Sequence, residues 1–221
     1  MAQMNKTIVA YAVILPILML GLVFGISYAF TAMTNKPVNA DNLTKNARQT
    51  KVLGGNQAEE PVLTVVEFSD LQCPACKAVQ PLIKQVGEKY PGKVRIAFRH
   101  FPLISIHKNA FRAAVAAEVA ASQNKFWEFH DVLFEKQQDW EALSGDQLDV
   151  AFAEYAESVG LNKDQFLQEL RNNTAIYAEK VQQDSRDANA LGVDATPTFY
   201  IDGYKVINEN LLQAIEKKLK S

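Results

Sequence analysis

The sequence has little cysteine, little histidine and no excess of charge of either sign. Its 221 residues include two cysteines and three histidines, and the formal net charge at pH 7 is -2. This balance argues against a nucleic-acid-binding protein, which normally carries a basic patch or stripe. There is also no internal repeat and no low-complexity tract. The length suits one domain with appendages, or two small domains.

The scarcity of metal-binding residues limits what the two cysteines can do. Both stand in one motif, Cys73-Pro74-Ala75-Cys76. A structural zinc site would need a second cysteine pair or more histidines, and covalent haem attachment needs a histidine where Lys77 stands. Copper would want the Met- or His-rich sites that are missing here. An inert disulfide remains an alternative, although so short a loop stabilises little. We therefore expect no metal and no cofactor.

Charge is absent from residues 7–33, which are rich in leucine, valine, isoleucine and alanine. About 20 such residues cross a hydrocarbon core of about 30 Å, and secretory signals usually have shorter apolar cores. We predict a short cytoplasmic N-terminus over residues 1–6 and a transmembrane signal anchor over residues 7–33. Ser27 and Ala29 are small residues at the positions that a signal peptidase reads, so cleavage of the segment is an alternative. Either form places the rest of the chain outside the cytoplasmic membrane.

Residues 34–60 are polar, contain the pair Gly54-Gly55 and show no sustained periodicity. We interpret them as a flexible linker between the membrane and a domain of residues 61–221.

The domain opens with the pattern of a β–α–β unit. Residues 62–68 form a nearly continuous apolar run typical of a buried strand. Residues 74–90 carry apolar side chains at helical spacing, and Pro91-Gly92 ends that helix. Residues 94–101 alternate as a second strand, which should lie parallel to the first.

The rest of the domain is predicted to be a helical block followed by a hairpin and a helix. Residues 107–191 show helical spacing throughout. Two short strands, residues 198–201 and 204–207, flank Asp202-Gly203, a hairpin-turn dipeptide. A closing helix follows from Leu211. We expect an α/β fold in which one small sheet is flanked by helices and interrupted by a helical insertion over about residues 105–191.

The position of the two cysteines suits thiol–disulfide exchange. Such exchange needs a thiolate that attacks and a second thiol that resolves the mixed disulfide. Cys73 lies at the predicted helix N-terminus, where free N–H groups and the helix dipole favour an anion. Pro74 fits the first helical position. Cys76 lies one turn further in. We therefore assign Cys73 as the nucleophile and Cys76 as the resolving thiol.

Three segments resemble the DsbA/DsbG family of thiol:disulfide oxidoreductases. The active-site segment is Phe68-Ser69-Asp70-Leu71-Gln72-Cys73-Pro74-Ala75-Cys76, and Phe126-Trp127-Glu128-Phe129-His130-Asp131 is similar to part of the family's helical insertion. Thr196-Pro197-Thr198-Phe199 resembles its cis-proline loop. The resemblance covers residues 61–221 and implies a thioredoxin-like fold, with a β–α–β unit, the insertion and a β–β–α unit.

The resemblance also implies roles for three further residues. Pro197 would be a cis proline that presents backbone groups to a substrate strand, and Thr196 would tune the active-site sulfurs. The alternative is an ordinary trans proline. Glu67 would be a buried acid that relays a proton to or from Cys76, unless it merely faces solvent at the strand end. His107 is either polar support near the site or a helix-start residue. Ala75 stands where the best-known oxidant of the family has a histidine between its cysteines. The loss of this potential cation argues that the present protein is a milder oxidant.

The resemblance implies a disulfide donor to exported proteins. We expect it in a bacterial cytoplasmic membrane, single-pass, with the catalytic domain on the extracytoplasmic side and a quinone-linked membrane protein as its oxidant. One alternative is a reductase or isomerase fed by a membrane electron donor, although residues 34–60 are too short and polar for a dimerisation domain. The other is a membrane-tethered chaperone or binding module whose cysteines are incidental.

Overall fold

The structure is a computed structural model that describes residues 18–27, 38, 40–45, 47–56, 60–206 and 210–220. It divides into two units, Met1–Pro37 and Val38–Ser221. In the first unit, residues 18–27 form a helix with exposed leucine, valine and phenylalanine side chains. None of the helices within the described ranges has the length and apolarity needed to cross a membrane. The remainder of the expected anchor and the expected cytoplasmic residues 1–6 lie outside those ranges.

The centre of the second unit is the predicted β–α–β unit. It consists of β2 (Leu63–Ser69), α3 (Pro74–Lys89) and β3 (Val94–His100). β2 and β3 pair in parallel, with Glu67 beside Phe98. Both strands are buried along almost their whole length. The apolar run of β2 predicts this, whereas the alternation predicted for β3 does not, because Arg99 and His100 are buried as well. The predicted parallel pairing is confirmed.

The predicted hairpin and closing helix complete this part of the fold. β4 (Thr198–Ile201) pairs antiparallel with both β2 and β5 (Tyr204–Lys205). Asp202 and Gly203 both have positive φ, 47° and 83°, as the two central residues of a type I′ turn require. α10 (Leu211–Leu219) begins after Asn210, whose side chain accepts a hydrogen bond from the Leu212 N–H.

The expected flexible linker over residues 34–60 is corrected by the structure, because part of it belongs to the fold. Gln49–Val52 form β1, which pairs antiparallel with β3 and gives the sheet order β1-β3-β2-β4-β5. Ala40–Lys45 form α2. The compact unit therefore begins at Val38 and not at residue 61. An edge strand is held mainly by main-chain hydrogen bonds to its neighbour, so β1 needs only one buried apolar side chain, Val52.

Helices fill the stretch between β3 and β4, as predicted for the insertion. Four large aromatic side chains, from Phe129, Trp140, Phe152 and Phe166, are fully buried in its core. The helices are α4 (Ala110–Ser122), α5 (Phe126–Glu135), α6 (Gln137–Trp140), α7 (Gly145–Ser158), α8 (Lys163–Asn172) and α9 (Thr174–Ala190).

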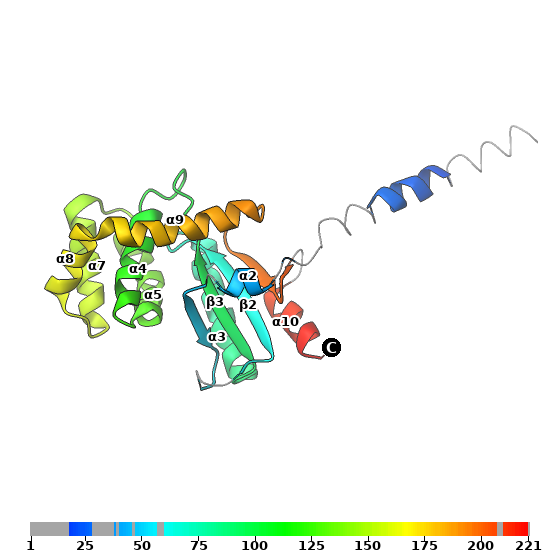
Figure 1. Ribbon diagram of the computed structural model, residues 1–221, viewed down its shortest axis with the longest axis horizontal. Helices are drawn as coiled ribbons and strands as arrows, with labels where there is room; N and C mark the ends of the chain where they lie inside the picture. The colour runs from blue at the N-terminus through cyan, green and yellow to red at the C-terminus, as the bar shows by residue number, and fades with distance from the viewer. Residues whose placement is uncertain are drawn as a thin grey trace, which may run out of the picture. The chain divides into compact units, whose positions relative to one another are not determined.

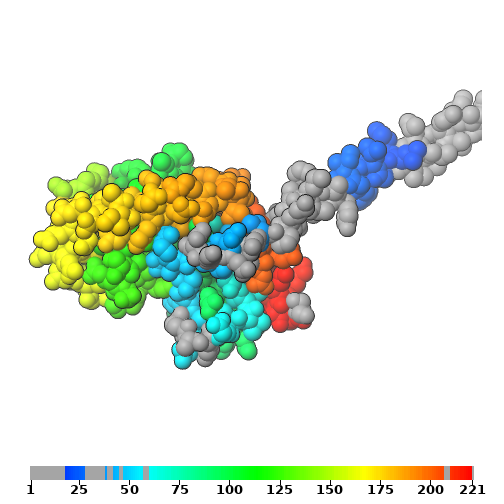
Figure 2. Space-filling view, in the orientation of Figure 1, coloured from blue at the N-terminus to red at the C-terminus, as the bar shows by residue number. Residues whose placement is uncertain are grey.

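Helices cover both faces of the sheet (Figure 1). α3 and α10 pack on one face, where Ile83 and Ile215 join Val65 in a common core. α2 and the end of α9 pack on the other face, where Leu43 and Ala188 share a core with β4. Figure 2 shows α9, gold to orange, running along the surface towards the blue α2 segment. The α3 face of β2 is thus the face that carries the two cysteines.

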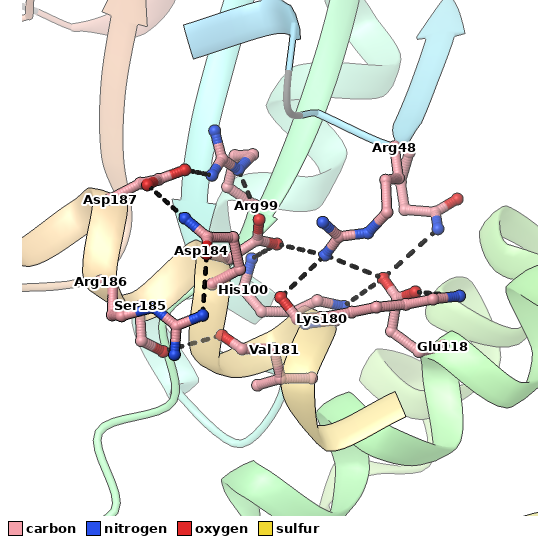
Figure 3. Close-up of polar contacts among 12 residues, drawn as sticks. Arg48, Arg99, His100, Glu118, Lys180, Val181, Asp184, Ser185, Arg186 and Asp187 are labelled. Atoms are coloured by element: carbon pink, nitrogen blue, oxygen red, sulfur yellow. Dashed lines mark hydrogen bonds and ion pairs between the residues drawn. The ribbon is translucent and has the colours of Figure 1, made fainter. Parts of the chain in front are cut away.

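A buried ion-pair network joins β3 to the end of α9 (Figure 3). Arg99 is 1% exposed, and its Nε donates to Asp184 at 2.7 Å. Its other nitrogens pair with Asp187 and donate to the Leu43 carbonyl at 3.1 Å. The backbone N–H of His100 donates to the second oxygen of Asp184 at 3.0 Å. The guanidinium therefore links α2, β3 and α9.

A second buried carboxylate extends this network towards β1. In Figure 3, Arg48 lies between Asp184 and Glu118, at 3.2 and 3.6 Å. Lys180 and His100 lie 3.5 and 3.3 Å from Glu118. Burial raises the pKa of Glu118, but His100, Arg48 and Lys180 outweigh it and lower this pKa to about 2. Residues just before β1 are therefore held to α4 and α9 by charge as well as by the sheet.

Replacing Arg99 with methionine is expected to destabilise the domain by roughly 3 kcal/mol, because the buried Asp184 carboxylate loses its closest charged partner and keeps only Arg48. Urea unfolding of a fragment that begins at Val38 measures this loss. The control is Arg186→Met, which removes an exposed pair with Glu179 and should cost less than about 1 kcal/mol. Equal, small losses in both variants would contradict a structural role for the network.

Candidate active site

The two cysteines lie at the N-terminus of α3, at the end of the central strand β2. Cys73 is the N-cap residue with extended backbone (φ -75°, ψ 123°), and Pro74 opens the helix. The Cys73 carbonyl accepts the first helical hydrogen bond, from Lys77 N–H at 3.1 Å. Both residues are buried, with Cys73 6% and Cys76 0% exposed, and both thiols are free. Cys73 is therefore the sulfur that a second molecule can reach.

The surroundings of Cys73 favour its thiolate. The thiol of Cys76 donates a hydrogen bond that lowers the pKa of Cys73, and this outweighs the opposing effect of burial. Thr196 and the backbone N–H groups of Ala75 and Cys76 lower it further, so the pKa of Cys73 is about 5. Those two N–H groups belong to the first helical turn, where they have no helical acceptor. At neutral pH the Cys73 sulfur is an anion and can act as a nucleophile.

The surroundings of Cys76 favour its protonated form. Burial, the interaction with Cys73 and the nearby charge of Glu67 all raise the pKa of Cys76. The Asp70 N–H donates to Cys76 Sγ at 3.5 Å and opposes this shift in part. The two pKa values are therefore moved apart, one sulfur being held as a thiolate and the other as a thiol.

The loop before β4 lies against Cys73. The Thr196–Pro197 peptide bond is cis. The Thr196 carbonyl oxygen lies 3.5 Å from Cys73 Sγ, although 123 residues separate them in the chain. β4 pairs antiparallel with β2 up to Phe68, which brings the residues before β4 to the cysteine end of β2. Sequence similarity placed Thr196 and Pro197 near the sulfurs, and the structure brings them together.

Glu67 is a buried carboxyl on the same side of the sheet as α3. It is 1% exposed and pairs in register with Phe98 on β3 and Phe199 on β4. Burial raises the pKa of Glu67 to about 7, with the Ser69 hydroxyl opposing and Cys73 adding to this rise. The side chain therefore does not face solvent, and near neutral pH it can hold or release a proton.

The helical insertion holds the loop before Cys73 through contacts that the sequence did not reveal. Gln137 Nε2 on α6 donates to the carbonyls of Leu71 and Cys73 at 3.0 and 3.2 Å. The Asn109 N–H donates to the Gln72 side chain at 2.7 Å. These partners lie 37 to 66 residues from the loop in the chain, and no local pattern marks such pairs.

Asp70 forms the third attachment of this loop. Its carboxylate is fully buried, contacts His107 Nδ1 at 2.7 Å and accepts from the Leu103 N–H at 2.9 Å. The other oxygen accepts from the Gln72 N–H at 2.8 Å. His107 thus supports the residues that carry the cysteines, one of the two roles that its sequence position allowed. Among the described residues, no group of three or more His, Cys, Asp or Glu side chains is placed to hold a metal ion.

A thioredoxin family model matches residues 46–221, which include β1, both cysteines and Pro197. The chain belongs to the thioredoxin family. The lower bound of the match agrees with the start of β1 and again places residues before 61 within the domain.

Within the thioredoxin family, solved structures of DsbA-type proteins have the same fold. BdbD from Bacillus subtilis, in its oxidised form, has a TM-score of 0.67 at 26% identity, and the match covers 85% of this chain and 97% of that one. A thioredoxin-like oxidoreductase from Silicibacter pomeroyi DSS-3 gives 0.63 at 25%, covering 83% and 96%. DsbA2 of Pseudomonas aeruginosa gives 0.59 at 25%, covering 78% and 96%. The chain thus has the fold of DsbA-type thiol–disulfide oxidoreductases.

Curated relatives share the domain in a different context. The Na(+)/H(+) antiporter NhaA 1 of Mycolicibacterium gilvum is 36% identical over 141 residues, which is 64% of this chain and 22% of that protein. NhaA 3 of Salinispora tropica is 39% identical over 145 residues, or 66% and 21%. The chain spans about a fifth of the length of these relatives, so the similarity concerns that part alone.

Proposed function

We propose that the protein exchanges disulfides with exported proteins through Cys73 and Cys76, and that it acts as a disulfide donor. One observation carries this proposal: at the N-terminus of α3, the pKa of Cys73 is lowered and the pKa of Cys76 is raised. A lowered pKa at Cys73 stabilises the reduced protein relative to its disulfide. A protein whose reduced form is stabilised tends to pass its disulfide on.

In the donor direction, a substrate thiolate attacks Cys73 Sγ of the Cys73–Cys76 disulfide. The new bond joins substrate and Cys73, and the Cys76 sulfur leaves with the electron pair and takes up a proton. A second substrate thiolate then attacks the substrate sulfur of the mixed disulfide, so Cys73 leaves as a thiolate. A leaving thiol with a low pKa leaves faster, which suits Cys73. Glu67 is the proposed source of the proton for Cys76.

The cis-proline loop is the proposed contact for the substrate chain. The Thr196 carbonyl lies beside Cys73 Sγ at 3.5 Å, and Pro197 follows it without an N–H of its own. An extended substrate segment next to Cys73 can pair with backbone groups of this loop, as an added strand pairs with a sheet edge. Thr196 has a second proposed role, since its contact with Cys73 helps to set the pKa of that thiol.

We further propose that the domain works outside a bacterial cytoplasmic membrane, tethered by residues 7–33. The support is the uncharged apolar run and the exposed apolar side chains of residues 18–27, which water does not favour. A tether of this kind would keep the domain near translocating chains. It would also keep it near the quinone-linked membrane protein that we propose as its oxidant.

An oxidative folding assay tests the donor function. The oxidised fragment from Val38 is mixed with a reduced, unfolded secreted protein, and native disulfides and free thiols are followed together. We expect one substrate disulfide to appear for each Cys73–Cys76 disulfide that becomes reduced. A fragment that instead reduces native substrate disulfides would contradict the donor direction and favour a reductase fed by a membrane electron donor.

A further inference from the structure

We propose that Ser69 relays the proton between Glu67 and Cys76. This inference rests on the proposed function and deepens it, because it assigns a path to the proton that Cys76 must gain or lose in each exchange. Ser69 stands two residues after Glu67 on β2 and is 1% exposed.

Strand geometry puts Glu67 and Ser69 on one side of the sheet. Alternate residues of a strand share a face, so both lie on the face of Val65, which packs with Ile83 and Val86 of α3. The end of β2 is fixed there, since the Ser69 carbonyl accepts from the Phe101 N–H at 2.8 Å. The next residue, Asp70, donates its N–H to Cys76 Sγ at 3.5 Å. Ser69 therefore lies between the carboxyl and the sulfur along the strand.

Polar atoms at this point are buried without hydrogen-bond partners. In the described part of the chain, Glu67 Oε1, Ser69 Oγ and Thr196 Oγ1 are all of this kind. Buried polar atoms are nearly always hydrogen-bonded, and exceptions gather where a group must change partner or charge. A cluster of such oxygens next to a sulfur that exchanges a proton fits that description.

The hydroxyl of Ser69 is close enough to both ends of the proposed path to affect their pKa values, although it forms no hydrogen bond to either in this structure. It lowers the pKa of Glu67 and also that of Cys76. A serine hydroxyl can donate one hydrogen bond while accepting others, so it can take a proton from one group as it gives its own to the next. Among the described residues, Glu67 Oε1 forms no hydrogen bond to Cys76 Sγ or to any other group.

The transfer balances within one exchange step. The substrate thiolate forms a bond to Cys73 Sγ, the Cys73–Cys76 bond breaks, and Cys76 Sγ gains the electron pair. The Ser69 hydroxyl gives its proton to Cys76 Sγ and takes the proton of Glu67. The products are a Cys76 thiol, a Glu67 carboxylate and an unchanged serine. When the disulfide is formed again, each transfer runs in reverse.

Other titratable groups near this path must be separated from it. His100 pairs in register with Ser69 on β3 and lies 3.3 Å from Glu118 of α4. His130 of α5 stacks edge-on against Phe98, beside Glu67. Asp70 and Cys73 are also close to Cys76. No hydrogen bond joins the hydroxyl of Ser69 to any of these groups, so a Ser69 variant isolates the path through Glu67.

The test is the pH profile of the reaction between the oxidised full-length protein, in detergent, and reduced glutathione. Ser69→Ala is expected to slow cleavage of the Cys73–Cys76 disulfide at least tenfold below pH 7, since positioned proton transfer typically contributes about 10²- to 10⁴-fold. The wild-type inflection near pH 7 should disappear, and the pH at which Cys73 titrates, measured separately on the reduced protein, should stay. Ser69→Thr, which keeps the hydroxyl, should restore the rate to within about threefold. Ser122→Ala is the control serine, and its profile should match wild type.

A double variant makes the test independent of any loss of stability. If Ser69 acts through Glu67, adding Ser69→Ala to Glu67→Gln should leave the rate unchanged, because the path is already broken. A further tenfold loss in the double variant, or a wild-type profile in Ser69→Ala alone, would overturn the relay. Wild-type protein that fails to exchange its disulfide with glutathione at all would instead overturn the proposed function.

Discussion

Replacing Cys73 with serine is expected to reduce disulfide transfer to the uncatalysed rate. Cys73 Sγ is the sulfur beside the cis-proline loop, and its pKa of about 5 keeps it a thiolate at neutral pH. A serine hydroxyl cannot form the mixed disulfide on which exchange depends. The oxidative folding assay measures the effect, with the fragment's unfolding midpoint as a check that the variant is folded.

Cys76→Ser is the matched variant, because it removes the second sulfur and keeps the first. Without a resolving thiol, mixed disulfides between Cys73 and substrate should accumulate, and mass spectrometry of the acid-quenched reaction detects them. Unaltered activity of the Cys73 variant in cells would support the alternative that the protein is a tethered chaperone with incidental cysteines.

The reduced domain is expected to gain about 3 kcal/mol of stability relative to the oxidised domain between pH 5 and pH 8. The pKa of Cys73 is about 5 in the folded state and about 8.5 in an unfolded chain. A lowered pKa stabilises the fold fully above the unfolded value, and this stabilisation is lost as the pH falls through the folded value. The gain should therefore grow across this window and vanish below pH 5.

Urea unfolding of both redox forms at several pH values measures this difference. Comparing the two forms cancels most of the contribution of Glu67, because its burial raises its pKa in the same direction in both forms. Cys73→Ser provides the control, since its stability should lack the reduced-form gain. A difference that stays constant from pH 5 to pH 8 would show that Cys73 is not held as a thiolate.

The sequence predicts the fold well where apolar periodicity is strong. The run at residues 62–68, the helix that begins at Pro74 and the Asp202-Gly203 turn each have a local signal that tertiary structure does not override. β1 lacks such a signal, because Gln49–Val52 is polar and its place depends on the unpaired edge of β3. An edge strand of this kind cannot be told from a linker by composition.

The residues of the candidate site likewise fall into those that the sequence identifies and those that only the tertiary structure identifies. Cys73 and Cys76 are marked by spacing and by their place before a helix, and Thr196 and Pro197 by similarity to a family. No feature of the sequence identifies Gln137 as a site residue, because it joins the site only when α6 packs against the loop before Cys73. The opposite pKa shifts of the two thiols likewise arise from burial and from groups distant in the chain, which composition does not contain.

The reduction potential of the Cys73–Cys76 pair tests the account most directly. Compared with a thiol of pKa about 7, as in thioredoxin, a pKa of about 5 stabilises the thiolate at pH 7 by roughly 2 kcal/mol, or about 50 mV. Equilibration of the fragment from Val38 with glutathione buffers should then give roughly -220 mV or a less negative value, towards the -120 mV or so of DsbA. A value near or below about -270 mV, that of thioredoxin, would contradict the account of Cys76 and Cys73 as a disulfide donor.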